Sequence, residues 1–110
     1  MGKEKAWIVA GDLRLDKVRF EVTWRGARVC LTAKEFWLLW TMASKAGKVF
    51  RRAELLSKVW GPGLVVELRT IDAHIKTLRK KLRAGPDDPS CIETVWGVGY
   101  RLNSAPGREG

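Results

Sequence analysis

The sequence contains little cysteine and histidine, with two cysteines and one histidine among 110 residues. A structural zinc site needs four closely spaced ligands of these types, so we expect no metal centre. Cys30 and Cys91 stand far apart in apolar, strand-like stretches, which favours two buried thiols over a disulfide and suits a reducing cytoplasm. No Ser/His/Asp set has a recognisable catalytic spacing, so we expect neither an enzyme nor a cofactor.

Long apolar runs are also missing. No run approaches the roughly 18 apolar residues that span a bilayer, so we expect no membrane segment. The N-terminus lacks the apolar region of a signal peptide, so we expect none there. Acidic residues are in the minority, because 21 Lys and Arg face 12 Asp and Glu and give a formal net charge of +9. This excess favours a polyanionic partner, nucleic acid first and an anionic membrane surface second.

The positive charge is concentrated in one short segment. Residues 69–83 carry six bases and one acid, a net charge of +5. Residues 84–110 carry two bases and four acids, a net charge of −2. Residues 1–31 and 32–68 carry +3 each. The electrostatic footprint for a polyanion is therefore local.

The chain length predicts one domain. We place it at residues 7–102, with a disordered N-terminus at 1–6 and a disordered tail at 103–110.

Alternating apolar residues predict a small antiparallel sheet near the N-terminus. The expected strands cover residues 12–16, 18–24 and 27–31, with a turn at Arg25 and Gly26. One face of the middle strand is expected to carry Val18, Phe20, Val22 and Trp24.

Two helices are predicted next. Thr32 and Glu35 have the spacing of a capping box, which begins a helix that runs to about Ala46 and ends at Gly47. Its expected core residues are Phe36, Leu39, Met42 and Ala43. A second helix spans 52–60 and stops at Gly61. Its expected buried residues are Leu55, Leu56, Val59 and Trp60.

The third predicted helix, residues 69–83, has one apolar and one basic side. Steps of about 100° per residue gather its apolar residues on a narrow stripe: Ile71, Ile75, Leu78 and Leu82. The opposite side carries Arg69, Ala73, Lys76, Thr77, Lys80 and Arg83. A DNA major groove of about 12 Å admits one helix, and this helix could hold the domain with one side and meet DNA with the other.

A C-terminal β-hairpin is predicted for residues 92–102, with its turn at Trp96 to Gly99. The fold class is therefore α+β: an N-terminal antiparallel sheet, three helices and a C-terminal hairpin, as in a winged helix-turn-helix domain. Basic helix faces are usually only solvated, but the adjoining hairpin and the local charge favour an interface with DNA here.

Four segments of the chain resemble the effector domain of OmpR/PhoB-type response regulators, which are winged-helix transcription factors: residues 31–39, 52–61, 69–82 and 92–102. Their order and spacing match over residues 12–102. The resemblance implies that the third helix enters the major groove and the hairpin acts as a wing on the adjacent minor groove or backbone.

The resemblance also implies assembly and signalling. Such proteins usually bind direct DNA repeats as head-to-tail dimers, and usually carry a receiver domain phosphorylated on aspartate in a two-component phosphorelay. A receiver does not fit in 110 residues. We therefore interpret the chain as an excised effector domain, with a stand-alone regulator as the alternative.

The basic helix face and the resemblance together predict the DNA contacts: Arg51, Arg52, Arg69, Ala73, His74, Lys76, Thr77, Arg79, Lys80, Trp96 and Tyr100. Thr77 and Trp96 stand where the family often has arginine. For Trp96, contact with DNA competes with packing back onto the core. For Tyr100, packing is favoured, with the hydroxyl group as a further phosphate contact.

Three helix residues have two interpretations each. Arg69 either contacts phosphate or pairs with Glu67 or Asp72. Arg79 either contacts phosphate or pairs with Asp72. His74 either contacts the DNA backbone or packs within the protein.

An apolar loop precedes the third helix. The resemblance implies a contact of this loop with RNA polymerase, through Gly63, Leu64, Val65, Val66 and Glu67. Packing under the loop is the alternative. Trp37 and Trp40 likewise either pack against the sheet or form a protein-contact patch.

The sequence thus predicts a non-enzymatic transcriptional regulator that binds double-stranded DNA sequence-specifically. The alternative is a winged-helix module that docks a protein and uses its charge for solubility. RNA binding ranks third, because stacking aromatics beyond Trp96 are scarce.

Overall fold

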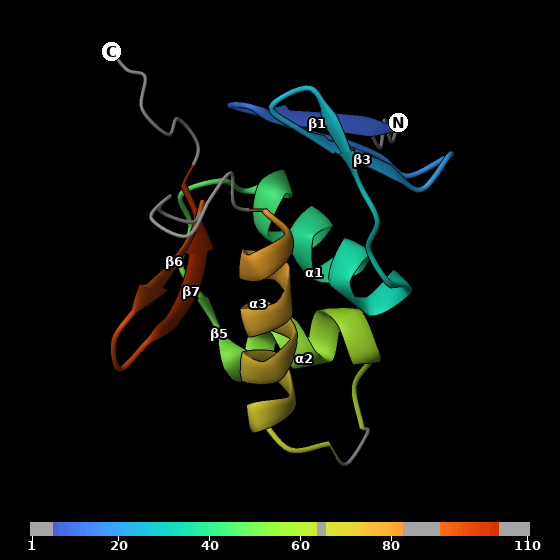
Figure 1. Ribbon diagram of the computed structural model, residues 1–110. Helices are drawn as coiled ribbons and strands as arrows, with labels where there is room; N and C mark the ends of the chain where they lie inside the picture. The colour runs from blue at the N-terminus through green and yellow to red at the C-terminus, as the bar shows by residue number, and fades with distance from the viewer. Residues whose placement is uncertain (1–5, 64–65, 83–90, 104–110) are drawn as a thin grey trace, which may run out of the picture.

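The computed structural model describes residues 6–63, 66–82 and 91–103 (Figure 1). Outside the described residues lie Leu64, Val65, Arg83 and most of the two ends that we predicted to be disordered. Within them, a sheet, three helices and a hairpin follow one another along the chain, which confirms the predicted α+β architecture. Figure 1 shows the sheet on one side of the helices and the hairpin beside the last helix.

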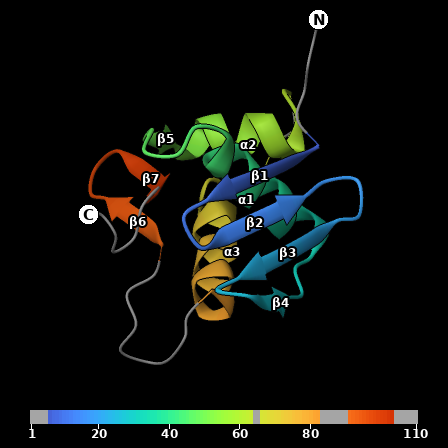
Figure 2. The same ribbon diagram turned by 90° about the horizontal axis from the view of Figure 1, so that it is seen from above.

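The N-terminal sheet contains four antiparallel strands in chain order: β1 (Trp7–Ala10), β2 (Leu13–Asp16), β3 (Glu21–Trp24) and β4 (Ala27–Val29). Successive side chains of a strand point to opposite faces of the sheet, so one face is directed toward the core. The buried residues of this face are Leu13, Leu15, Val22 and Trp24. Figure 2 shows this sheet lying across the first and third helices.

The strand expected at residues 18–24 begins only at Glu21. Asp16 ends β2, because its Oδ1 accepts hydrogen bonds from the backbone N–H groups of Val18 (2.9 Å) and Arg19 (3.0 Å). Such local side-chain bonds offer the backbone an alternative to a sheet ladder. Val18, which we expected on the same strand face as Val22 and Trp24, is therefore outside the strand and 76% exposed.

Phe20 also leaves the expected sheet face. Its backbone has a φ of 58°, the left-handed region that ends a turn, and its side chain is 44% exposed. The ring stacks on Phe36, with the centroids 4.3 Å apart, and meets the edge of Trp37 at 5.5 Å. The strand placement of Phe20 was therefore wrong, because this residue ends the turn before β3 and packs its ring against α1.

The two cysteines differ from each other. Cys91 is buried in the core, as expected, but Cys30 is exposed. The prediction of two buried thiols is wrong for Cys30, because β4 ends at Val29 and Cys30 lies in the exposed connection to the first helix.

The first helix, α1 (Ala33–Ser44), begins with the predicted capping box. The Glu35 amide donates to Thr32 Oγ1 at 3.2 Å, and the Thr32 amide donates to Glu35 Oε1 at 2.9 Å. The helix ends two residues before Ala46, with Lys45 as its C-cap and Gly47 at a φ of 93° just beyond.

The second and third helices complete the core. In α2 (Arg52–Trp60), Leu55 is fully buried, whereas the other expected core residues are half-buried: Leu56, Val59 and Trp60. In α3 (Arg69–Lys81), the predicted apolar stripe is confirmed, because Ile71, Ile75, Leu78 and the C-cap Leu82 are all buried. These side chains join the inner sheet face in one hydrophobic cluster.

The hairpin consists of β6 (Ile92–Val95) and β7 (Gly99–Leu102). A short strand, β5 (Phe50–Arg51), pairs with β7 and ends where α2 begins. We expected Gly99 to be a turn glycine, but it lies in β7 between two strands. A Cβ at Gly99 would come within 1.9 Å of the Phe50 carbonyl oxygen, so this close strand approach requires glycine.

Among the described helices, none is long and apolar enough to cross a membrane. The described residues also bring together no cluster of three His, Cys, Asp or Glu side chains that could hold a metal ion.

Candidate nucleic-acid interface

One side of α3 is exposed and basic. Because the buried stripe faces the core, the opposite side presents Arg69, Ala73, Lys76, Thr77 and Lys80, all of which are exposed. The Thr77 hydroxyl donates to the Ala73 carbonyl at 3.2 Å. The hydroxyl oxygen therefore keeps its acceptor lone pairs, and the methyl group remains available for apolar contact.

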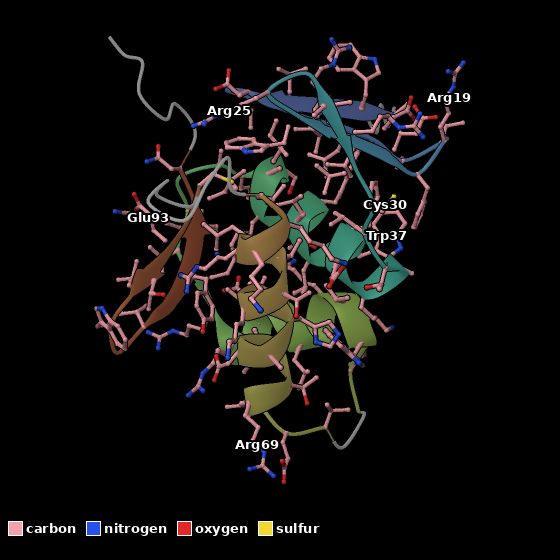
Figure 3. The ribbon with its side chains drawn as sticks, viewed as in Figure 1. Arg19, Arg25, Cys30, Trp37, Arg69 and Glu93 are labelled. Carbon is pink, nitrogen blue, oxygen red and sulfur yellow. The ribbon has the colours of Figure 1, made fainter. Side chains whose placement is uncertain are left out.

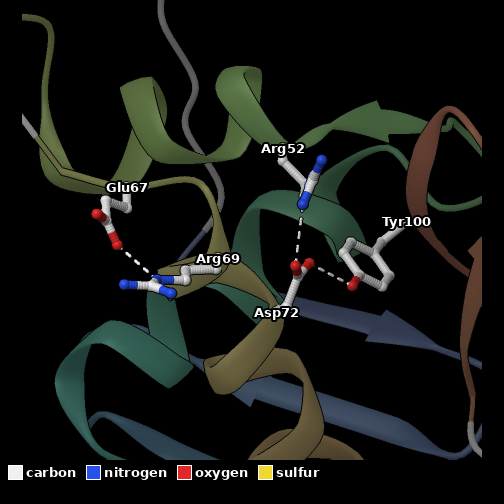
Figure 4. Close-up of polar contacts among 5 residues, drawn as sticks. All are labelled: Arg52, Glu67, Arg69, Asp72 and Tyr100. Atoms are coloured by element: carbon white, nitrogen blue, oxygen red, sulfur yellow. Dashed lines mark hydrogen bonds and ion pairs between the residues drawn. The ribbon is translucent and has the colours of Figure 1, made fainter.

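Arg69 lies at the exposed end of α3, where it forms an ion pair with Glu67 (Figure 4). The Nε to Oε1 distance is 2.5 Å, and the two side chains are 81% and 69% exposed. Of the two ion pairs considered for Arg69, the structure shows the one with Glu67. Exposed pairs of this kind contribute little, so a phosphate could replace the carboxylate at low cost.

Asp72 connects three elements (Figure 4). Its Oδ2 accepts from Arg52 of α2 at 2.9 Å, and its Oδ1 accepts from the hydroxyl of Tyr100 of β7 at 2.6 Å. The Tyr100 hydroxyl is therefore engaged within the protein. Burial and the adjacent Asp72 carboxylate raise the pKa of Tyr100 to about 12.

Arg79 connects α3 to the hairpin. Its Nε donates to the Ile92 carbonyl at 3.1 Å, and its terminal nitrogen donates to Thr94 Oγ1 at 2.5 Å. Its guanidinium also lies 5.5 Å from the Tyr100 ring centroid, a cation–π contact. The ion pair with Asp72 that we considered for Arg79 is thus replaced by bonds to the hairpin.

His74 packs between helices. Its Nδ1 lies 2.8 Å from the Thr70 carbonyl, and its ring meets the edge of Trp60 at 5.1 Å. Lys34 covers the Trp60 ring, with Nζ 5.1 Å from the centroid. His74 is half-buried in this arrangement, at the margin of the basic side of α3.

Trp96 projects from the hairpin tip and is 89% exposed. The turn is closed by a hydrogen bond of 2.9 Å from the Val98 amide to the Val95 carbonyl, and Gly97 has a φ of 81°. Trp96 therefore does not fold back onto the core.

Arg51 and Arg52 lie at the start of α2 and are both exposed. Arg51 pairs with Gly99 in the register of β5 and β7, which places the start of α2 at the base of the hairpin. The Arg51 amide donates to Glu54 at 3.3 Å. A hydrogen bond from Lys48 to Glu54 lowers the pKa of that carboxylate.

The loop before α3 is described in part. Gly63 and Glu67 are exposed, Val66 is half-buried, and Leu64 and Val65 lie outside the described residues. Trp37 and Trp40 are half-buried against Phe36, which corresponds to the packing interpretation of these side chains.

Sequence reasoning considered Asp72 only as an ion-pair partner of Arg69 or Arg79 and missed its bonds to Arg52 and Tyr100. It also missed Thr94 as a partner of Arg79. A usable signal existed for Asp72, because it is the one acidic residue among the six bases of residues 69–83. The sequence contains no such signal for Thr94, because its partner Arg79 is 15 residues away in the chain.

Comparison with known proteins identifies the family. The profile described as "Transcriptional regulatory protein, C terminal" matches residues 26–102. The transcriptional regulatory protein BaeR of Escherichia coli is 47% identical over 89 residues, which cover 81% of this chain and 37% of BaeR. The transcriptional regulatory protein ResD of Bacillus subtilis is 42% identical over 96 residues, which cover 86% of this chain and 40% of ResD. The chain thus spans less than half the length of these curated relatives.

Solved structures agree with this match. The DNA-binding domain of RstA from Klebsiella pneumoniae, in complex with the RstA box, superposes with a TM-score of 0.78 at 32% identity over 91% of this chain and 99% of that one. The response regulator DrrB from Thermotoga maritima, an OmpR/PhoB homolog, gives a TM-score of 0.78 at 39% identity over 91% of this chain and 45% of that one. The effector domains of this family regulate transcription and are not enzymes. The chain therefore belongs to the family of C-terminal domains of transcriptional regulatory proteins, the winged-helix effector domains of OmpR/PhoB-type response regulators.

Proposed function

We propose that this chain binds a specific double-stranded DNA sequence and thereby regulates transcription. In this proposal α3 enters the major groove, and the hairpin of β6 and β7 reaches the adjacent minor groove or backbone. The observation that carries the proposal is the exposed basic side of α3 next to an exposed hairpin tip (Figure 3). The related RstA domain, solved in complex with its DNA box, supports it.

The exposed bases supply phosphate contacts. Lys76 and Lys80 lie on the outer side of α3, Arg69 lies at its N-terminal end, and Arg51 lies at the start of α2. Each long cationic side chain can neutralise one phosphate and release its counterions.

Base recognition falls to the short side chains between these cations. Ala73 and Thr77 lie one helical turn apart and leave room for close approach of a base edge. The methyl groups of both residues suit a thymine methyl group, and the Thr77 oxygen can accept a hydrogen bond from an exposed base amine.

Arg52, His74, Arg79 and Tyr100 lie at the margin of this surface. Their polar groups already have partners within the protein. We therefore expect them to contribute less direct contact than the exposed lysines, and Trp96 to contribute the main contact of the hairpin tip.

Further partners follow from the family resemblance. We propose binding to direct repeats as a head-to-tail dimer, in the cytoplasm, with Gly63 to Glu67 directed toward RNA polymerase. The exposure of Gly63 and Glu67 supports this last contact.

Salt-dependent binding tests the central proposal. The 110-residue chain is first used to select duplexes from a random-sequence library, and the affinity for a selected duplex is then measured at two salt concentrations. For these four phosphate contacts, raising the salt from about 50 to about 200 mM should weaken binding by about two orders of magnitude. An affinity that hardly changes with salt would contradict the proposal and favour a protein-docking role for the domain.

A further inference from the structure

The wing, residues 92–102, is attached to the rest of the domain by two different kinds of bond. On one side, backbone pairing joins β7 to β5, with Gly99 opposite Arg51 at the start of α2. On the other side, side-chain bonds join it to α3: Tyr100 to Asp72, and Arg79 to the Ile92 carbonyl and Thr94. The wing is therefore fixed relative to both helices of the helix-turn-helix.

Asp72 lies where these attachments meet. Its two carboxylate oxygens bind groups from two different elements, Arg52 of α2 and Tyr100 of β7, while its backbone belongs to α3. A cleft of about 280 Å³ is lined by Arg52 and Asp72 of the helices and by residues of the wing, among them Tyr100 and Trp96. Both partners of the bond from Tyr100 to Asp72 thus line this cleft.

The charge of Asp72 makes its position unusual. It is the single acid on a helix whose exposed side is proposed to face phosphates, and a like charge near a phosphate is repelled. The Asp72 carboxylate by itself therefore reduces the attraction of α3 to DNA. If Asp72 favours DNA binding, it must do so through the residues that it holds in place.

We propose that Asp72 is a positioning residue that fixes the wing relative to α3, so that contacts of Trp96 and contacts of the basic side of α3 form together on one DNA site. This inference rests on the proposed function, because it concerns how the two parts of that interface are coupled. Asp72 itself touches no DNA. It orients Tyr100, and through Tyr100 the hairpin, and it holds the Arg52 guanidinium beside the start of α3.

Charge and geometry make opposite predictions for Asp72→Asn. The substitution removes one negative charge, so a purely electrostatic role predicts tighter binding to every duplex. A positioning role predicts about tenfold weaker binding to a selected duplex, with random-sequence duplex binding unchanged or tighter. Asp12→Asn is the matched control, because it removes the same charge from the turn between β1 and β2, where Asp12 pairs with Arg25.

Coupling is measured with Trp96→Ala. In the unmodified chain, loss of this exposed side chain should weaken binding to the selected duplex by about tenfold. In the Asp72→Asn background, the same substitution should cost about twofold, because an unfixed wing no longer delivers Trp96 to the site. Tyr100→Phe should reproduce this effect while keeping the ring against Arg79.

A measurement without DNA isolates the bond itself. Tyr100 is the one tyrosine of the chain, so the ultraviolet absorbance of tyrosinate reports this residue alone. Asp72→Asn should lower the Tyr100 pKa from its raised value of about 12. Circular dichroism spectra and thermal unfolding establish that each variant is folded before binding is compared.

The outcomes separate the inference from the proposed function. An unmodified chain that prefers no duplex overturns both. A chain that selects a duplex, but in which Trp96→Ala costs the same with and without Asp72, overturns the inference alone. Equal weakening of selected and random duplexes by Asp72→Asn also overturns it.

Discussion

At the scale of single residues, Thr77 is the residue that we propose reads a base. It lies on the exposed side of α3 between Lys76 and Lys80. Its hydroxyl proton is engaged with the Ala73 carbonyl, so it offers a base an acceptor oxygen and a methyl group. Its proposed role is to select a base pair, whereas the neighbouring lysines supply affinity.

Thr77→Ala should relax the preference at one base pair. The loss of discrimination is expected to be about 1–3 kcal/mol at that position, with affinity for other sequences nearly unchanged. Lys76→Ala is the control, because loss of a phosphate contact should weaken all duplexes equally. Measured affinities for duplexes with each base pair at each site position test this, and an unchanged preference profile would remove Thr77 from the reading residues.

Gly99 is the residue on which the base of the wing depends. Gly99→Ala places a Cβ 1.9 Å from the Phe50 carbonyl oxygen, so β5 and β7 must separate. We expect a loss of about 3 kcal/mol or more in the free energy of unfolding. Gly97→Ala is the control: its φ of 81° makes it strained, but nothing lies within 4 Å of the added carbon. Urea denaturation compares the two, and equal losses would show that the close approach at Gly99 costs no more than the backbone strain at Gly97.

At the scale of elements, two helices of this domain carry a glutamate in the first turn that caps the backbone and binds a lysine. Glu35 of α1 is buried and binds Lys81 at the end of α3 at 2.7 Å. Glu54 of α2 binds Lys48 at 2.9 Å but is far more exposed. The same local motif therefore joins α1 to α3 through Glu35, whereas through Glu54 it fixes only the start of α2.

Glu35→Gln should destabilise the domain by about 1–3 kcal/mol near neutral pH, because Lys81 loses a buried partner. Burial raises the pKa of Glu35, but hydrogen bonds from Lys81 and Thr32 outweigh it and leave the pKa lowered. A lowered pKa means that the ionised form stabilises the fold above pH 4.5, and that this stability is lost as the pH falls. The difference between the two proteins should therefore shrink in acid.

Urea denaturation at neutral and acidic pH measures this difference. Glu54→Gln is the matched control and should have a smaller effect at both pH values, since its ion pair is solvated. A constant effect of Glu35→Gln across pH would contradict a role for the Glu35 charge.

The elements were predictable where the pattern was local. The capping box of Thr32 and Glu35, the apolar stripe of α3 and the stop at Gly61 all depend on residues within one or two turns. The bonds of Arg79 and Asp72 were not, because their partners come from distant elements. The turn at residues 17–20 was missed because the Asp16 side chain outcompeted an alternating pattern that favours a strand.

At the scale of the whole molecule, one hydrophobic cluster unites both sheets and all three helices. The inner sheet face meets α1 and α3, and the hairpin adds Ile92 and Leu102 to the same cluster. The exposed basic side of α3 is consequently supported by the entire domain, which gives the interface a rigid base.

Unfolding should therefore be a single transition. Four of the six tryptophans belong to the sheet or α1: Trp7, Trp24, Trp37 and Trp40. Their fluorescence reports mainly the N-terminal half, whereas far-ultraviolet circular dichroism reports all three helices. Coincident urea curves from the two signals are expected for one cooperative unit. A fluorescence change that precedes the loss of helix would show that the sheet unfolds by itself.

The exposed Cys30 has a practical consequence for this domain. Cys91 is 3% exposed, so a maleimide dye should react at Cys30 first. Cys30 leads from β4 into α1, on a different part of the molecule from Arg69 and the start of α3 (Figure 3). The natural sequence therefore already provides a single attachment point from which energy transfer to a labelled duplex could report the orientation of the domain on DNA.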